Sequence, residues 1–239
     1  MNKIERQDKL IIIHLDNGAE NYLQNPDFVN QKDLRKAVEE EETKAIIIRG
    51  TGRHFSAGAD LEEIKKRLKS GDLEASLEKG KMLFSYIKSL NIPLISAVEG
   101  VCFGAGFEIV LHSDIRIAGR KALFAFPEVN HNLMPGLGGT RLLPKTAGTA
   151  KALEILLKGD LIDAEAAQKW KLIDHICEPK QSFEQALQLA RKMTSGRPLY
   201  VIQAITQAVR NAAEKSYEEA LEEETLLFSH LARKAYWND

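Results

Sequence analysis

The sequence has few of the residues that signal a disulfide framework, a metal centre or a membrane span. Its two cysteines, Cys102 and Cys177, form no CxxC pair, so a disulfide scaffold is not expected. The six histidines show no HExxH or comparable ligand spacing, so no metal site is predicted. No apolar run approaches the length that crosses a bilayer. The polar N-terminus resembles neither a signal nor a transit peptide, and we expect a cytoplasmic protein without membrane contact.

An excess of charge of one sign is also missing. The 33 Lys and Arg residues nearly balance the 34 Asp and Glu residues, which leaves a formal net charge of -1. Such a balance provides no general attraction to nucleic acid, and no nucleic-acid partner is expected. The basic cluster KKR at residues 65–67 fits a solvated helix face better than a ligand contact. With 44% hydrophobic and 28% charged residues in a chain of 239, the composition is that of an ordinary globular protein.

Apolar runs predict the strands of an α/β core. Buried strands are expected at residues 10–15, 45–50 and 93–98. Shorter strand candidates lie at residues 114–118, 123–126 and 172–176. Segments with helical spacing predict helices at residues 30–42, from 61 onward, at 77–89 and at 105–112. Strands that alternate with helices in this way favour parallel β-α-β units.

Beyond about residue 138 the pattern becomes helical. Helices are expected at residues 149–157, 163–170, 183–195, 200–213 and 217–236. No linker rich in Pro, Gly or Ser precedes these helices, so they are expected to pack on the core or on a neighbouring subunit. We therefore divide the chain into an α/β core at residues 1–195 and a C-terminal helical region at residues 196–239.

Three glycine-rich loops follow predicted strands, and ligand sites of parallel α/β proteins gather at the carboxyl ends of strands. The first loop, at residues 50–60, has the sequence GTGRHFSAGAD. Gly58 permits a tight turn, and Ala57 and Ala59 are small enough for a ligand to approach the main chain. The helix expected after Asp60 adds a positive dipole end. A plain turn with Asp60 as helix N-cap explains the same residues equally well.

The other two loops each carry a glutamate among apolar residues. Glu108 ends the sequence GVCFGAGFE, and Glu128 lies in FPE, ahead of the sequence MPGLGG. A charged carboxylate in apolar surroundings is costly unless it is used, although a surface position is the usual fate of a lone glutamate such as Glu128. Gly104-Ala-Gly106 lacks the third glycine of a dinucleotide fingerprint, and no phosphate loop is present. Two carboxylates beside turns that expose N–H groups favour acid–base chemistry at an oxyanion hole.

Other candidate residues have weaker support. His131 is close enough in sequence to Glu128 to line the same pocket, but a polar loop residue is the more frequent outcome. No G-x-S-x-G elbow supports Ser56 or Ser113 as a nucleophile. Cys102 fits a small buried residue better than a nucleophile.

Together, the three loops resemble the crotonase (enoyl-CoA hydratase/isomerase) family, from the first strand to about residue 230. The resemblance implies a spiral of β-β-α units with a helical C-terminal trimerisation region. It also implies acyl thioesters as ligands and assembly as a homotrimer or a dimer of trimers. Because the sequence ends with AYWND at residues 235–239, a thioester on a carrier protein is considered beside acyl-CoA.

The resemblance also assigns roles to individual residues. Ala59 and Ala105 match the positions whose backbone N–H groups form the oxyanion hole, and Glu108 and Glu128 match the two catalytic carboxylates. Gly136 matches the N–H that positions the reacting water. The residues expected to lie along the CoA moiety are Ala57, Asp60 and Leu61.

The leading functional hypothesis is therefore an enoyl-CoA hydratase-like lyase of fatty acid metabolism, with no cofactor other than the CoA of its substrate. Glu128 would serve as the acid–base group at the α-carbon, and Glu108 would activate water. One alternative within the fold is an isomerase, decarboxylase or thioester hydrolase of a biosynthetic pathway. A second alternative is a protein that binds acyl-CoA without reacting with it.

Overall fold

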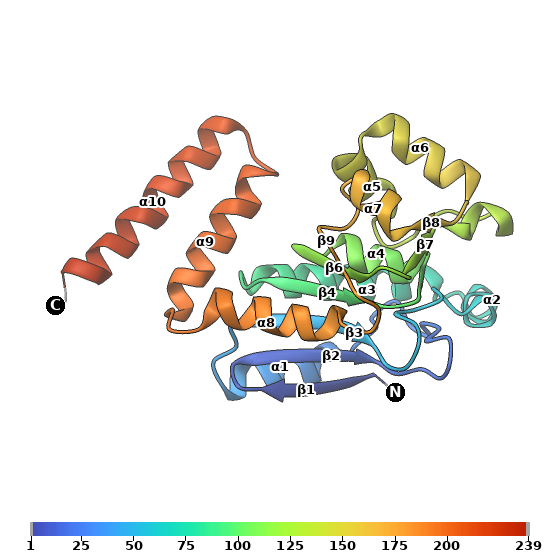
Figure 1. Ribbon diagram of the computed structural model, residues 1–239, viewed down its shortest axis with the longest axis horizontal. Helices are drawn as coiled ribbons and strands as arrows, with labels where there is room; N and C mark the ends of the chain where they lie inside the picture. The colour runs from blue at the N-terminus through green and yellow to red at the C-terminus, as the bar shows by residue number, and fades with distance from the viewer. Residues whose placement is uncertain (1, 238–239) are drawn as a thin grey trace.

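A six-stranded sheet runs through the middle of the molecule, and a computed structural model describes it for residues 2–237 (Figure 1). The spatial order of its strands is β1-β2-β3-β4-β6-β9. Their bounds are Lys3–Gln7 (β1), Leu10–Leu15 (β2), Ala45–Gly50 (β3), Leu94–Val98 (β4), Ile115–Gly119 (β6) and His175–Cys177 (β9). The strands β2, β3, β4, β6 and β9 are parallel to their neighbours, as expected. The first pair differs, since β1 and β2 form an antiparallel hairpin.

The sheet is buried on both faces because its central strands carry apolar side chains on both sides. Ile11 pairs with Ile46 and faces one cluster, while Ile12 pairs with Ile47 and faces the other. This alternation follows from the two-residue period of a strand. Leu34 of helix α1 (Gln31–Glu40) belongs to the first cluster. The second cluster is covered by α8 (Ser182–Thr194), which lies across the sheet in Figure 1.

A smaller, three-stranded sheet adjoins two of the glycine-rich loops. It contains β5 (Val101–Phe103), β7 (Leu123–Ala125) and β8 (Ile162–Asp163), in that order. Strand β5 lies within the second loop, and β7 directly precedes the third. The strand β4 of the large sheet continues into β5, and β6 continues into β7, and each pair leads into helical structure. These are the β-β-α units that the family resemblance implied. Sequence patterning missed β5 and β8 because two or three residues are too short for a period to show.

Most of the helices that complete the core lie close to their expected positions. They are α2 (Leu61–Ser70), α3 (Leu73–Ser89), α4 (Ala105–Leu111), α6 (Thr149–Lys158) and α7 (Ala164–Lys169). The structure adds two helices that were not among those expected, the 3-10 helix η1 (Pro127–His131) and α5 (Gly139–Ala147). The strand expected at residues 172–176 is partly wrong, since β9 begins only at His175. Leu172 and Ile173 are buried in the connection from α7, so their apolar character reflects core packing outside a strand.

The last two helices, α9 (Leu199–Ala212) and α10 (Tyr217–Tyr236), project away from the sheets (Figure 1). Arg210 ties α9 to the core through Asp114 and the backbone carbonyls of Lys88 and Ile92. A capping box at Ser216 and Glu219 starts α10, which packs mainly along α9 and buries none of its own residues. Within residues 2–237, no helix is both long and apolar enough to span a bilayer. The division of the chain at residue 195 stays a prediction.

Candidate active site

The three glycine-rich loops meet at one cavity of about 510 Å³. All the residues that the sequence singled out as site candidates line this cavity: Ala57, Ala59, Asp60, Leu61, Ala105, Glu108, Glu128 and Gly136. His131 lines the same cavity as Glu128, as its place in the sequence suggested, and it is an exposed residue at the end of η1. The rest of the wall is largely apolar and comes from α2, α3 and the loops around them, with side chains such as Ile64, Leu73, Leu77 and Met134.

Two turns place backbone N–H groups side by side at the cavity wall. Gly58 has a φ of +100° and Gly104 a φ of +47°, values that a side chain would strain. A Cβ built on Gly58 would lie 3.0 Å from the carbonyl oxygen of Phe103 and 3.8 Å from the nitrogen of Ala105, so the turns touch. Within residues 2–237, no backbone hydrogen bond uses the N–H of Ala59 or Ala105. Both groups are thus free to donate to a ligand.

A buried hydrogen-bond network fixes the turn that carries Ala59. Asn21, itself fully buried, donates to the carbonyl oxygens of Thr51 and His54, each at 2.9 Å. The Ser56 hydroxyl donates to the carbonyl oxygen of Asn21 at 2.7 Å and accepts from the N–H of Gly58 at 3.1 Å. Because every polar group in this chain of contacts has a partner, the turn is held in one conformation.

Glu108 is a buried carboxylate surrounded by backbone donors. Its side chain comes from the first turn of α4, and only 1% of the residue is exposed. The Oε1 atom accepts from the N–H of Leu137 at 2.8 Å and from the N–H of Gly139 at 2.7 Å. Burial raises the pKa of Glu108, whereas the N–H groups of Gly139, Leu137 and Gly136 oppose that rise. The donors therefore favour the ionised carboxylate.

Glu128 occupies a different environment on η1. Within residues 2–237, its Oε2 atom is buried without a hydrogen-bond partner. Burial raises the pKa of Glu128 to about 7, and the charge of Glu108 contributes to the rise. Burial thus raises the pKa of both carboxyl groups, but only Glu108 has the donors of the α5 turn, which favour its ionised form. Such unequal surroundings suit a pair of carboxyl groups that divide the acid and base roles.

Two candidate residues have a second, structural contact. Asp60 is the N-cap of α2, and its side chain accepts from the N–H of Glu62 at 2.9 Å, which is the alternative weighed for it from the sequence. Gly136 lines the cavity, but its N–H also stabilises the carboxylate of Glu108. The roles of both residues toward a ligand stay predictions.

Sequence reasoning missed the donors that hold Glu108. The N–H groups of Leu137 and Gly139 lie at the start of α5, where the φ of Gly138 is +110°. The glycine-rich stretch ahead of a helix was the available signal, since the first N–H groups of a helix lack partners within it.

Arg67, expected on a solvated helix face, also lines the cavity, where it contacts Asp72 and Asn25. Across the described part of the chain, no group of three or more His, Cys, Asp or Glu side chains could hold a metal ion.

One family model and several named proteins are similar to this chain. The family model described as enoyl-CoA hydratase/isomerase matches residues 5–238. A protein of Escherichia coli named 2,3-dehydroadipyl-CoA hydratase is 34% identical over 232 residues, which cover 96% of this chain and 89% of that protein. The mitochondrial enoyl-CoA hydratase of Pongo abelii is 35% identical over 202 residues, covering 84% of this chain and 68% of that protein.

Solved structures show the same similarity in three dimensions. The crystal structure of an enoyl-CoA hydratase from a Polaromonas species has a TM-score of 0.88 at 25% identity and covers 96% of this chain and 90% of that one. An enoyl-CoA hydratase subunit from Geobacillus kaustophilus has a TM-score of 0.82 at 30% identity, and the match covers 96% of this chain and 89% of that one. The crotonase-like α/β fold expected from the sequence is thereby confirmed.

Proposed function

The chain belongs to the enoyl-CoA hydratase/isomerase family, and we propose that it adds water to, or removes water from, an α,β-unsaturated acyl-CoA thioester. One observation carries the proposal. Glu108, held by the N–H groups of Leu137 and Gly139, and Glu128, whose Oε2 atom has no hydrogen-bond partner within residues 2–237, face one cavity. The unused N–H groups of Ala59 and Ala105 face the same cavity. A hydratase needs a base, an acid and an oxyanion site around one thioester, and this cavity brings these groups together.

The proposed mechanism follows the charge that develops during hydration. When water attacks the β-carbon, negative charge collects on the thioester oxygen, and the N–H groups of Ala59 and Ala105 donate to that oxygen. One such donor is worth roughly 3 kcal/mol of transition-state stabilisation. Glu108 takes a proton from the attacking water, and Glu128 gives its proton to the α-carbon. The pair keeps one proton in total throughout, so the reaction runs in reverse through the same groups.

The cavity also suggests how the substrate lies. Ala57, Asp60 and Leu61 are proposed to line the CoA moiety, and the apolar wall on α2 and α3 is proposed to receive the acyl chain. Arg67 adds a cation to that wall. The E. coli relative is named for an acyl group that ends in a carboxylate, and a substrate panel therefore includes a dicarboxylic enoyl-CoA beside unbranched and branched ones. A thioester on a carrier protein is the remaining ligand to compare.

The test is hydration of this panel, followed by loss of the enoyl absorbance, with products identified by mass spectrometry. Glu108→Gln and Glu128→Gln should each lower kcat at least ~100-fold, because general acid–base groups contribute that much. Glu74→Gln, at an exposed position in the first turn of α3, is the matched control. Binding of acyl-CoA without turnover across the whole panel would contradict the proposal and favour a non-catalytic acyl-CoA-binding protein.

An isomerase is the second candidate, because the pKa of about 7 makes Glu128 a base able to move a proton between two carbons by itself. An isomerase does not need Glu108 to activate water. Full activity of Glu108→Gln on a β,γ-unsaturated acyl-CoA, with a double-bond isomer as product, would favour this reaction. Release of carbon dioxide or of free CoA would instead identify a decarboxylase or a thioester hydrolase.

For assembly, we propose a homotrimer or a dimer of trimers. Support comes from α10, which buries none of its own residues and exposes several large apolar side chains that a neighbouring subunit could cover. These side chains are Leu221, Leu226, Phe228 and Tyr236. No cofactor beyond the CoA of the substrate is proposed. The cytoplasmic location stays a prediction, since some relatives are named as mitochondrial proteins.

A further inference from the structure

Leu137, in the glycine-rich loop ahead of α5, is held at both of its backbone polar groups by side chains of helix α4 and its C-cap. The N–H of Leu137 donates to Glu108 Oε1 at 2.8 Å, and the carbonyl oxygen of Leu137 lies 2.9 Å from His112 Nε2. Glu108 is in the first turn of α4, and His112 is the residue that caps its end, four positions later. Side chains four residues apart on a helix point in the same direction, so both reach the same loop.

We propose that His112 is a positioning residue for the reaction proposed above: it anchors the carbonyl of Leu137 so that the loop keeps its N–H groups aimed at Glu108. This inference rests on the proposed function for its meaning in catalysis, but the contact itself does not. A carbonyl oxygen can only accept, so the proton of the bond belongs to His112 Nε2.

The imidazole ring is itself fixed in place. It stacks on the ring of Phe84 from α3, with centroids 3.7 Å apart and an interplanar angle of 13°. On the loop side, a Cβ built on Gly138 would stand 3.3 Å from His112 Nε2, so the glycine leaves room for the ring. With stacking on one side and a hydrogen bond at its tip, the ring has one orientation. A fixed ring is what a positioning role requires.

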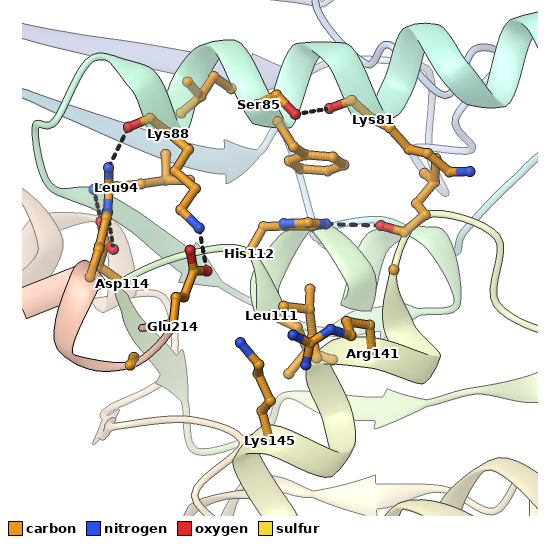
Figure 2. Close-up of a pocket in the computed structure, with 17 residues that line it drawn as sticks. Lys81, Ser85, Lys88, Leu94, Leu111, His112, Asp114, Arg141, Lys145 and Glu214 are labelled. Atoms are coloured by element: carbon orange, nitrogen blue, oxygen red, sulfur yellow. Dashed lines mark hydrogen bonds and ion pairs between the residues drawn. The ribbon is translucent and has the colours of Figure 1, made fainter. Parts of the chain in front are cut away.

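The surroundings of His112 favour its neutral form. The ring borders a second cavity, of about 420 Å³, which Leu137 also lines (Figure 2). Burial lowers the pKa of His112 and the charge of Lys88 lowers it further, against the opposing effect of the bond to Leu137. The other charged groups at this cavity include Arg141 and Lys145 from α5 and Glu214, which follows α9.

Figure 2 shows the outcome of this arrangement. The dashed line from His112 is its bond to the loop carbonyl, and Lys88 pairs with Glu214 at the side of the cavity. A neutral imidazole with its proton on Nε2 donates to Leu137 and brings no positive charge to the back of the loop that holds the Glu108 carboxylate. The bond from His112 to the Leu137 carbonyl therefore acts by fixing the position of the loop and not by its charge. Without this bond, the N–H groups of Leu137 and Gly139 should point less accurately at the Glu108 carboxylate.

The test compares two substitutions at this position. His112→Leu fills similar space without a donor, whereas His112→Gln places an amide N–H near the position of Nε2. His112→Leu should lower kcat at least about 10-fold with KM nearly unchanged, since small misplacements of catalytic groups have effects of this size. His112→Gln should restore most of the rate. Lys145→Gln, which alters the same cavity without touching Leu137, is the matched control.

A second readout does not depend on activity. Titration of the Glu108 carboxyl by carbon-13 NMR should show a higher pKa in His112→Leu than in the wild type and in His112→Gln, because poorly aligned N–H groups stabilise the carboxylate less. If the wild type turns over no thioester, the proposed function fails, and this titration still decides the inference. An unchanged Glu108 titration in His112→Leu, or equal rate losses in the Leu and Gln variants, would overturn it. If His112→Leu does not fold, His112→Asn, whose amide is too short to reach the carbonyl, replaces it.

Discussion

Glu128 and Gly104 lie so close together that a Cβ built on the glycine would stand 2.7 Å from Glu128 Oε1. Gly104 directly precedes Ala105, whose N–H lines the same cavity, and its φ of +47° lies in the region that side chains avoid. A residue without a side chain is thus needed here for two reasons, the shape of the turn and the space for the carboxyl group.

Replacing Gly104 tests this contact. Gly104→Ala should displace the Glu128 carboxyl and strain the turn, lowering kcat at least about 10-fold, because catalytic groups tolerate little misplacement. Steady-state hydration kinetics measure the effect. Gly52→Ala is the matched control, since Gly52 also has a positive φ, +81°, but a Cβ built on it would have no heavy atom within 4 Å. Equal losses in the two variants would show that backbone strain alone explains the effect.

The pH dependence of the reaction should report the carboxyl pair. Catalysis needs one proton on the pair, and the pKa of Glu128 is about 7, so kcat/KM should fall as the pH rises above neutral and that last proton is lost. Hydration and dehydration should share this alkaline limb, because both start from the singly protonated pair. Rates measured in both directions across the pH range test the point. A rate that stays constant well above neutral pH would contradict it.

Glu128 should also reduce the stability of the fold at higher pH. Its pKa is raised from 4.5 to about 7 on folding, so the folded state binds more protons and loses stability as the pH rises between these values. Glu128→Gln removes this loss and should gain up to about 3 kcal/mol above neutral pH, with little gain below the unfolded pKa.

Chemical denaturation of wild type and variant across the pH range would measure the gain from Glu128→Gln. The exposed control Glu222→Gln should show no such pH-dependent difference. A gain of the same size at acidic and alkaline pH would mean that side-chain packing, and not the ionised carboxylate, causes it.

Assembly through α10 is open to a direct test. Leu226 and Phe228 on this helix are 70% and 71% exposed. If α10 packs against a neighbouring subunit, Leu226→Lys and Phe228→Lys should each convert the oligomer to monomers in analytical ultracentrifugation. Leu157→Lys, at a leucine of α6 that is 69% exposed, is the control expected to leave the oligomer intact. A wild-type protein that sediments as a monomer would contradict the proposed trimer.

The agreement between sequence and structure is closest where a pattern is local. The expected bounds of β2, β3 and α10 match the observed ones, because a run of apolar residues or a long helical period carries its own signal. The turns at Gly58 and Gly104 were also recognisable from the sequence, because a position with a positive φ favours glycine over other residues. The family resemblance of the three loops then predicted that all eight site residues would share one cavity.

The tertiary structure alone decided how the two glutamates differ. Both are glutamates in apolar surroundings, and no local pattern separates them. Glu108 is stabilised by N–H groups that lie about thirty positions away, on Leu137 and Gly139, while the Oε2 atom of Glu128 has no hydrogen-bond partner within the described residues. Every residue type except proline has a backbone N–H, so these donors leave no signature in a sequence, and only the folded chain shows which carboxyl group they reach. The sequence by itself determined the fold and which residues line the cavity, and the packing of distant segments determined the different surroundings of the two carboxyl groups.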